Sequence, residues 1–184
     1  MLVGGRERAE IVLCDHDASW PARFEAERQR LSAAIGADAV AIEHIGSTAV
    51  PGLAAKPIID ILVTVDAVEP DDGFRGRLEA AGYVLRVREP EHRMFRTAAR
   101  DVHVHVWAAE HEAVARYLVF RDWLRHDAAD RALYERRKRE LATRVWSDMN
   151  HYADAKSDVI VPIVERGMSA ARRRLGPWAS PSPG

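Results

Sequence analysis

The segment EHIGSTAVPGLAAKPIIDILVTV, residues 43–65, carries the pattern that decides the fold. It begins with a Gly-Ser turn, passes through a Pro-Gly turn and a Lys-Pro step, and ends in branched apolar residues interrupted only by Asp60 and Thr64. Such a nearly continuous apolar run predicts a central β-strand over 57–65. A carboxylate in such a strand is costly unless it is paired, hydrogen-bonded or bound to a cation. Asp60 is therefore the first candidate for a functional residue.

The composition limits the classes of protein to consider. The 184 residues suffice for one domain or a domain with a small appendage. The net charge of −1 counts against a general nucleic-acid coat or a membrane-surface binder, because both usually need a basic excess. The single cysteine, Cys14, cannot form an internal disulfide and fits a reducing compartment. Since no apolar stretch is long enough for a membrane span or a signal peptide, we expect a cytoplasmic protein. The sequence does not indicate its oligomeric state.

The pattern around the opening segment predicts an α+β fold with a mixed sheet and flanking helices. A helix is expected over 17–36, with Ser19 as its cap, and a short helix over 74–82. The expected strands are 10–16, 39–45, 57–65, 83–90, 93–99 and 101–108. The last three strands follow one another closely, which favours an antiparallel meander.

From Glu110 onward the residue pattern is typical of helices. Helices are expected over 110–127, 128–146 and 148–175, with Pro162 predicting a kink or a restart in the last one. We therefore divide the chain into an α/β core at 1–109, a helical region packed on it at 110–176, and a Pro/Ser/Gly-rich tail at 177–184 that we expect to be mobile.

The Gly-Ser turn is a candidate phosphate site. Gly46 lets the backbone approach a bound anion, and the amides and hydroxyls of Ser47 and Thr48 would point at a phosphate. Lys56 precedes a proline, which keeps it extended so that its ammonium group can reach across. The alternatives are an ordinary turn with a helix cap, and a solvated lysine.

Asp60 and a histidine pair are candidate metal ligands. Carboxylates suit hard cations such as magnesium. His103 and His105 are two residues apart on a strand, so they share one face and could bind a metal or, when protonated, a phosphate. The alternatives are a carboxylate that caps a loop at a sheet edge, and the solvent-facing half of an amphipathic strand.

Three helical stretches place cations beside aromatic residues. Arg121 lies near Phe120 and Trp123. Helical spacing puts two lysines beside tyrosines, in the pairs Tyr134 with Lys138 and Tyr152 with Lys156. These faces could close over a polyphosphate. The alternative in each case is a solvated helix face with local ion pairs.

The opening segment, together with the stretches HVHVW, FRDWLR, YERRK and HYADAK, resembles the GrpB-like family, over roughly residues 8–170. That family is placed in the nucleotidyltransferase superfamily, which has the polymerase-beta-type fold. The resemblance implies that Gly46 and Ser47 hold nucleotide phosphates, and that two acids one residue apart on a strand, with a third on a neighbouring strand, hold magnesium. Only Asp60 matches this pattern, because Ile58 and Leu62 flank it at the spacing of a pair. The third acid is replaced by His103 and His105.

The first functional hypothesis, implied by the resemblance, is a transferase. It would pass a nucleotidyl or related phosphoryl group from a nucleoside triphosphate to a small-molecule acceptor, with nucleic acid not expected as a partner. Asp60, His103 and His105 would be the catalytic and metal-binding residues. The phosphates would be held by Gly46, Ser47, Thr48, Lys56, Arg121 and Lys138. The metal would be magnesium or manganese, with zinc as an alternative.

The second hypothesis is a non-catalytic module that binds a nucleotide or a phosphorylated metabolite, or serves a partner enzyme. The incomplete acid pair favours it. The resemblance also implies that related domains occur fused to a dephospho-coenzyme-A kinase domain. This chain itself has no GxxxxGK[ST] loop of the kind that such a kinase uses.

Overall fold

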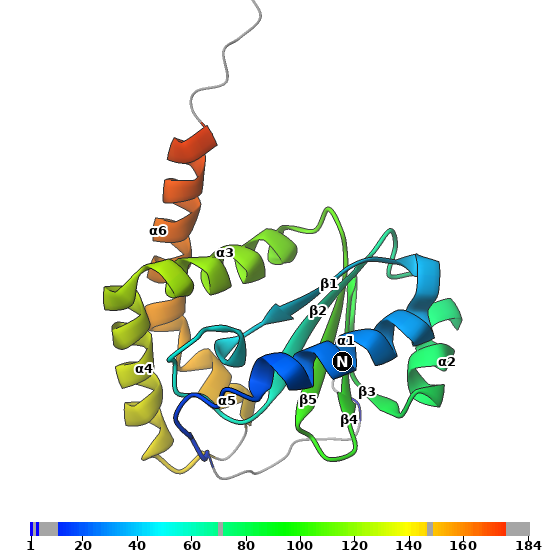
Figure 1. The fold of residues 1–184 in the computed structure, drawn as a ribbon, viewed down its shortest axis with the longest axis horizontal. Helices are drawn as coiled ribbons and strands as arrows, with labels where there is room; N and C mark the ends of the chain where they lie inside the picture. The colour runs from blue at the N-terminus through cyan, green and yellow to red at the C-terminus, as the bar shows by residue number, and fades with distance from the viewer. Residues whose placement is uncertain (2, 4–10, 70–71, 147–148, 176–184) are drawn as a thin grey trace, which may run out of the picture.

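The computed structural model describes residues 1, 3, 11–69, 72–146 and 149–175, and its centre is a five-stranded mixed sheet (Figure 1). The strand order is β1-β2-β5-β4-β3. The strands are β1 (Ala39–Ile45), β2 (Ile59–Val65), β3 (Tyr83–Glu89), β4 (His92–Thr97) and β5 (Val102–Ala108). β1 and β2 are antiparallel, β2 and β5 are parallel, and β3, β4 and β5 form an antiparallel meander. The predicted α+β class and the predicted meander are both confirmed.

Helices α1 (Trp20–Ile35) and α2 (Asp72–Ala80) cover one face of the sheet (Figure 1). This face holds the largest core cluster, in which Leu31 and Leu78 pack with Ile61 of the central strand. Pro21 fits the first turn of α1, as predicted, because its missing N–H would have had no partner in the helix. The predicted cap differs, since the Ser19 side chain makes no capping hydrogen bond.

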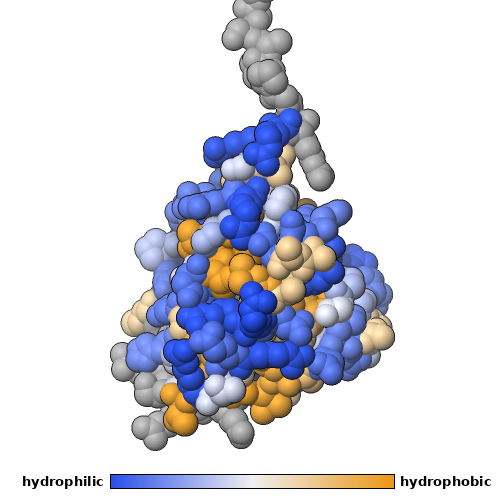
Figure 2. Space-filling view, turned by 90° about the vertical axis from the view of Figure 1, so that its left-hand side faces the viewer, coloured by the Kyte–Doolittle hydropathy of each residue, from blue (hydrophilic) through white to orange (hydrophobic). Residues whose placement is uncertain are grey.

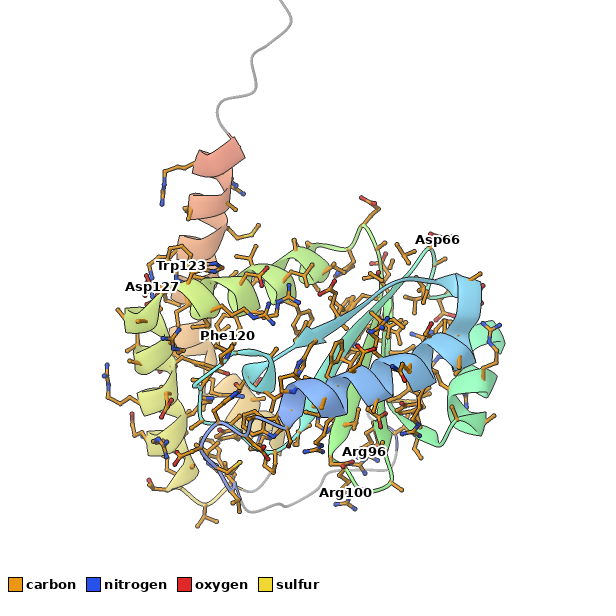
Figure 3. All side chains as sticks on the ribbon, in the orientation of Figure 1. Asp66, Arg96, Arg100, Phe120, Trp123 and Asp127 are labelled. Carbon is orange, nitrogen blue, oxygen red and sulfur yellow. The ribbon has the colours of Figure 1, made fainter. Side chains whose placement is uncertain are left out.

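The remaining helices gather at the β1 side of the sheet. They are α3 (Glu112–His126), α4 (Ala128–Ala142), α5 (Met149–Asp154) and α6 (Ser157–Leu175). Phe120, Trp123 and Asp127 lie at the end of α3 that faces α4 and α6 (Figure 3). The Asp130 carboxylate of α4 accepts hydrogen bonds from Trp123 Nε1 at 2.6 Å and Arg166 Nη2 at 2.6 Å, so it ties three helices together. This side of the molecule is largely hydrophilic, with a hydrophobic area at its centre (Figure 2).

Two predicted elements differ in the structure. The expected strand over 10–16 is reduced to a single bridge between Cys14 and Ala55. The expected helix over 148–175 is broken after Asp154 and restarts at Ser157, so the break comes before Pro162, which lies inside α6. Lys156 lies in the break, and its Nζ is 4.7 Å from the centre of the buried Tyr152 ring of α5, the partner that helical spacing predicted.

Two further expectations concern the ends of the chain and the membrane. The tail at 177–184 lies outside the described residues. Within the described residues, no helix combines the length and the apolar character that crossing a membrane requires.

Candidate active site

The central strand β2 presents a different kind of residue to each face of the sheet. Ile59, Ile61 and Val63 are fully buried under α1 and α2. Because successive side chains alternate between faces, Asp60 points to the opposite face. In the parallel pairing with β5, Asp60 lies beside His103. The predicted carboxylate and one predicted histidine therefore meet across two neighbouring strands.

A cross-strand row extends from this pair. Asp60 is paired with Ile45 of β1 on one side and with His103 on the other, and His103 is paired in turn with Arg96 of β4. Arg96 lies near the turn between β4 and β5 (Figure 3). It was not among the candidates from the sequence, because only the strand register places it in this row. The row thus joins a carboxylate, an imidazole and a guanidinium on one face.

The Asp60 carboxylate lies against the His103 ring. Oδ1 of Asp60 lies 3.3 Å from Nδ1 of His103, with 30% and 24% of the respective side chains exposed. Burial alone would raise the pKa of Asp60. The hydrogen bond from His103 and the nearby positive charge of Lys56 help to outweigh burial, so the pKa of Asp60 lies below its ordinary value. The carboxylate is thus held in its ionised form.

Gly46 is required by its closeness to Asp60. Its φ of +71° lies in the left-handed region that favours glycine, and a Cβ added there would lie 2.5 Å from Asp60 Oδ2. The Gly-Ser turn therefore sits directly against the carboxylate. Any side chain at position 46 would push the two apart.

His105 shares the face of His103 but has a different partner. Its Nδ1 lies 3.3 Å from Nε2 of His92, and the two rings are stacked with an interplanar angle of 4°. Burial lowers the pKa of His105 to about 4, so the ring is neutral at pH 7. Of the two predicted histidines, His103 is the one within ion-pair distance of Asp60.

The donor set around Asp60 bears on the predicted metal. Among the described residues, no three histidine, cysteine, aspartate or glutamate side chains come close enough together to form a metal site of their own. Magnesium in nucleotide-binding proteins is usually held by one or two carboxylates together with substrate phosphates and water. Asp60, with one oxygen against the Gly46 turn, fits that second type of site.

Ser47 begins a short 3₁₀ turn, Ser47–Ala49, and meets the helical half of the molecule there. Lys138 of α4 donates a hydrogen bond to Ser47 Oγ at 3.2 Å and another to the carbonyl oxygen of Ala54. Only 2% of Lys138 is exposed. The two groups predicted from separate parts of the sequence are therefore in direct contact.

The chain has three lysines, and all three lie close enough together to interact electrostatically near the Gly-Ser turn. Lys138 Nζ lies 4.7 Å from the centre of the Tyr134 ring, and Lys156 and Lys56 lie 4.7 Å and 5.3 Å from the centre of the Tyr152 ring. Within the described residues, none of the three has a carboxylate within ion-pair distance.

The lysines share one electrostatic environment. Burial and the neighbouring Lys156 charge lower the pKa of Lys138 to about 7, and the same two causes lower the pKa of Lys56. Burial lowers the pKa of Lys156, while the negative charge of Asp60 opposes that shift. A multiply charged anion would stabilise the charged forms of these amines, of which one is buried and two are half-buried.

Thr48 and Arg121 lie apart from the lysines. The Thr48 hydroxyl lies 3.0 Å from His44 Nε2 and donates to the carbonyl of Ile58 at 3.1 Å. Arg121, 11% exposed, donates to Glu43 Oε2 at 2.7 Å and to the carbonyl of His44 at 3.0 Å. Both residues therefore fix β1 and the Gly-Ser turn in position.

Comparison with known proteins identifies a family model and several related sequences that match this chain. The family model described as GrpB protein matches residues 10–166. The UPF0157 protein SCO7215 of Streptomyces coelicolor is 56% identical over 172 residues, which is 94% of this chain and 91% of that protein. The dephospho-CoA kinase of Mycolicibacterium paratuberculosis is 31% identical, over 94% of this chain but 47% of that protein.

Solved structures show the same fold. The crystal structure of the conserved protein GrpB from Enterococcus faecalis matches with a TM-score of 0.79 and 31% identity, over 87% of this chain and 99% of that chain. A more distant match is the GLD-2/RNP-8 complex, with a TM-score of 0.57 and 16% identity, over 82% of this chain and 59% of that chain. Another is the Cid1 poly(U) polymerase with MgGTP bound, with a TM-score of 0.50 and 18% identity, over 71% of this chain and 44% of that chain. The chain therefore belongs to the GrpB family, and its fold is that of the nucleotidyltransferase superfamily.

Proposed function

We propose that this protein transfers a nucleotidyl group, or a related phosphoryl group, from a nucleoside triphosphate to a small-molecule acceptor with the help of a divalent cation. The observation that carries the proposal is that Lys138 binds Ser47 of the turn while the other two lysines, Lys56 and Lys156, lie within electrostatic reach of the ionised Asp60. Cations without carboxylate partners next to a glycine turn are an arrangement that suits a polyphosphate.

The phosphate chain would lie along the turn. Ser47, already hydrogen-bonded to Lys138, would hold one phosphate, and Lys56 and Lys156 would neutralise the others. The divalent ion would be held by Asp60 and the phosphate oxygens, where it would neutralise charge that develops on the phosphates. Since little covalent chemistry is asked of the protein, positioning and charge are its main contributions.

The transfer itself is a displacement at phosphorus. An oxygen or nitrogen of the acceptor forms a bond to the α-phosphorus, the bond from that phosphorus to the bridging oxygen breaks, and pyrophosphate leaves. The acceptor loses one proton to a base, for which His103 is the candidate beside Asp60. Arg96, in register with His103, would add positive charge at the acceptor side of the row.

The comparisons support a nucleotide as the substrate class. Cid1, which has a related fold, is described as a poly(U) polymerase with MgGTP bound. That description applies to Cid1 itself, and here it favours nucleoside triphosphates as the first compounds to test. The near-zero net charge still favours a small acceptor over a nucleic acid.

A second candidate function is a binding module without turnover. The observation that favours it is the single carboxylate of the cross-strand row. The other positions of the row hold Ile45, His103 and Arg96, so among the described residues no second acid joins Asp60 there. Such a module would use the same lysines to hold a nucleotide or a phosphorylated metabolite.

The lysine content allows a direct test. Protein labelled with ¹³C and ¹⁵N in lysine gives three side-chain signals, all of which come from the proposed site. We expect nucleoside triphosphates with magnesium or manganese to shift all three signals and to raise the melting temperature. Pyrophosphate release would then be screened with small alcohols and amines as acceptors.

Two variants make the test specific. Asp60→Ala should abolish the effect of the metal, whereas Asp66→Ala, at an exposed position just beyond the far end of the same strand (Figure 3), should behave as wild type. Binding that persists without any turnover across the acceptor screen would favour the binding module. If neither a nucleotide nor a phosphorylated metabolite shifts the lysine signals, both functions are wrong.

A further inference from the structure

Three side chains connect β3, β4 and β5 on the face of the sheet that carries Asp60. This face is turned away from α1, since the alternate residues of β5 pack into the core on the other side (Figure 1). The Glu89 carboxylate lies 3.2 Å from Nδ1 of His92, and Nε2 of His92 lies 3.3 Å from Nδ1 of His105. The two ring planes are parallel to within 4°, and the ring centres, 5.6 Å apart, lie farther from each other than these nitrogens do. The two nitrogens therefore face each other, as a hydrogen bond requires.

Glu89 decides where each ring carries its proton. An ionised carboxylate only accepts hydrogen bonds, so His92 carries its proton on Nδ1, which faces Glu89. The Nε2 of His92 is then a lone pair, and it receives the N–H of His105 Nδ1. Burial lowers the pKa of both rings, that of His105 to about 4, so both are neutral at pH 7. The remaining nitrogen of His105, Nε2, is therefore left as a lone pair.

This Nε2 of His105 is open to a ligand. It has no hydrogen-bond partner among the described residues, and it is not one of the fully buried polar atoms that lack a partner. It faces away from His92, which is bonded to the other nitrogen of the ring. The charge of Asp60 opposes the lowering of the His105 pKa, so the ring lies within reach of the proposed reaction centre.

His103 presents a second lone pair of the same kind. Its Nδ1 faces Asp60 at 3.3 Å, so the neutral ring carries its proton there and leaves Nε2 without one. This nitrogen too has no hydrogen-bond partner among the residues that the structure describes. Positions two residues apart on a strand share a face and are separated by about 6.6 Å. Two lone pairs thus stand side by side, one fixed directly by a carboxylate and the other through His92.

We propose that His103 and His105 together bind the acceptor substrate of the transfer, and that this substrate carries two hydroxyl groups on adjacent carbons, as a sugar does. Two hydrogen bonds of about 2.8 Å each span most of the separation of about 6.6 Å. A pair of neighbouring hydroxyls can therefore bridge the two rings, whereas a single hydroxyl reaches only one of them.

The two hydroxyls would have different roles. The one at His103 would attack and lose its proton to that ring, since Asp60 and the proposed cation lie there. The one at His105 would be held in place and would select the diol. Glu89 and His92 are positioning residues, because they fix which nitrogen of His105 is free to receive a hydroxyl. The role of the diol rests on the proposed function, but its binding is measured without any nucleotide.

The ring protons are tested first. Protein labelled with ¹⁵N in its eight histidines reports which nitrogen of each ring carries the proton. We expect His105 in wild type to carry it on Nδ1, and Glu89→Ala to introduce the other form. The matched control, Glu110→Ala at an exposed position after β5, should change nothing. A proton on Nε2 of His105 in wild type would overturn the proposal, and a His105 ring that ignores Glu89→Ala would overturn the role of Glu89.

Methyl riboside is the probe for the diol, and methyl deoxyriboside, which lacks one of the two neighbouring hydroxyls, is its matched control. We expect the riboside to shift the Nε2 signals of His103 and His105 saturably, with a Kd of about 10 mM. The deoxyriboside should bind about fivefold more weakly, because one hydrogen bond is lost. His105→Phe should remove this difference, whereas His126→Phe, at the exposed end of α3, should retain it.

Thermal melting shows whether each variant is folded, and the comparison of the two ribosides on wild type needs no variant. The proposal is overturned if the riboside does not saturate any signal by about 100 mM, or if it binds no more tightly than the deoxyriboside. If the lysine signals respond to nucleotides while the riboside fails to bind, the proposed function stands and this inference alone is wrong. Selective riboside binding by a protein whose lysine signals ignore nucleotides would support the diol site and contradict the proposed function.

Discussion

The two faces of the central sheet show how one strand can serve stability and chemistry at once. On the α1 side, the residues of β2 are all apolar and fully buried, as Ile61 illustrates. On the other side, the adjacent Asp60 is held ionised among an imidazole and lysine ammonium groups. Because neighbouring positions in a strand point in opposite directions, the core can be packed tightly without constraining the site.

The largest expected effect is on the buried face. Ile61→Ala should lower the free energy of unfolding by about 4 kcal/mol, because it removes buried methyl groups and leaves a cavity in a packed core. Chemical denaturation of the variant measures this loss. Nucleotide binding by the fraction that remains folded should stay close to wild type. A folded Ile61→Ala protein with no nucleotide affinity would show that the two faces are not independent.

The second prediction concerns acid pH and His44, whose ring packs on the α1 side. Burial lowers the pKa of His44 to about 4 in the folded protein, whereas in the unfolded chain the pKa has its ordinary value of 6.5. As the pH falls, the unfolded state therefore binds the proton first. The contribution of His44 to stability is therefore complete above pH 6.5 and is lost as the pH falls towards 4, by roughly 3 kcal/mol. Denaturation of wild type and His44→Gln across this range measures it. Parallel pH profiles for the two proteins would contradict the prediction.

The third prediction concerns the site face. Asp60→Asn keeps the shape of the side chain but removes its charge, so metal-dependent binding or turnover of the triphosphate should fall about 100-fold, which is about 2.7 kcal/mol. The melting temperature without ligand should change little compared with Ile61→Ala. Isothermal titration with magnesium and nucleotide gives the affinity. An unchanged affinity in Asp60→Asn would remove the carboxylate from the site.

The smallest effect expected is the movement of about one proton. The pKa of Lys138 is about 7, and a bound phosphate would raise it because it favours the charged form. Nucleotide binding at about pH 8 should therefore take up a proton, most of it at Lys138, and Lys138→Met should remove that uptake. Calorimetry in two buffers of different ionisation enthalpy measures it. Proton release on binding would contradict the assignment.

The sequence allowed much of the sheet to be predicted, and less of the site. β1 was predicted with its observed bounds, because an apolar run there is closed by Gly46. The break between α5 and α6 was missed, since no proline or glycine marks Ala155 and Lys156. The residue types around Asp60 suggested an anion site, but the register that places Arg96 in the same row depends on strand pairing, which the local sequence does not encode.

The scarcity of lysine has a practical consequence. The chain carries 27 lysine and arginine residues, yet its lysine side chains are confined to one place. Coupling agents, biotin esters and amine-reactive biosensor chips would therefore act through the candidate site or through the α-amino group. Attachment through an affinity tag or an engineered cysteine far from the turn would leave the site untouched in binding studies, whereas Cys14 bridges to Ala55 beside Lys56 and is unsuitable for it.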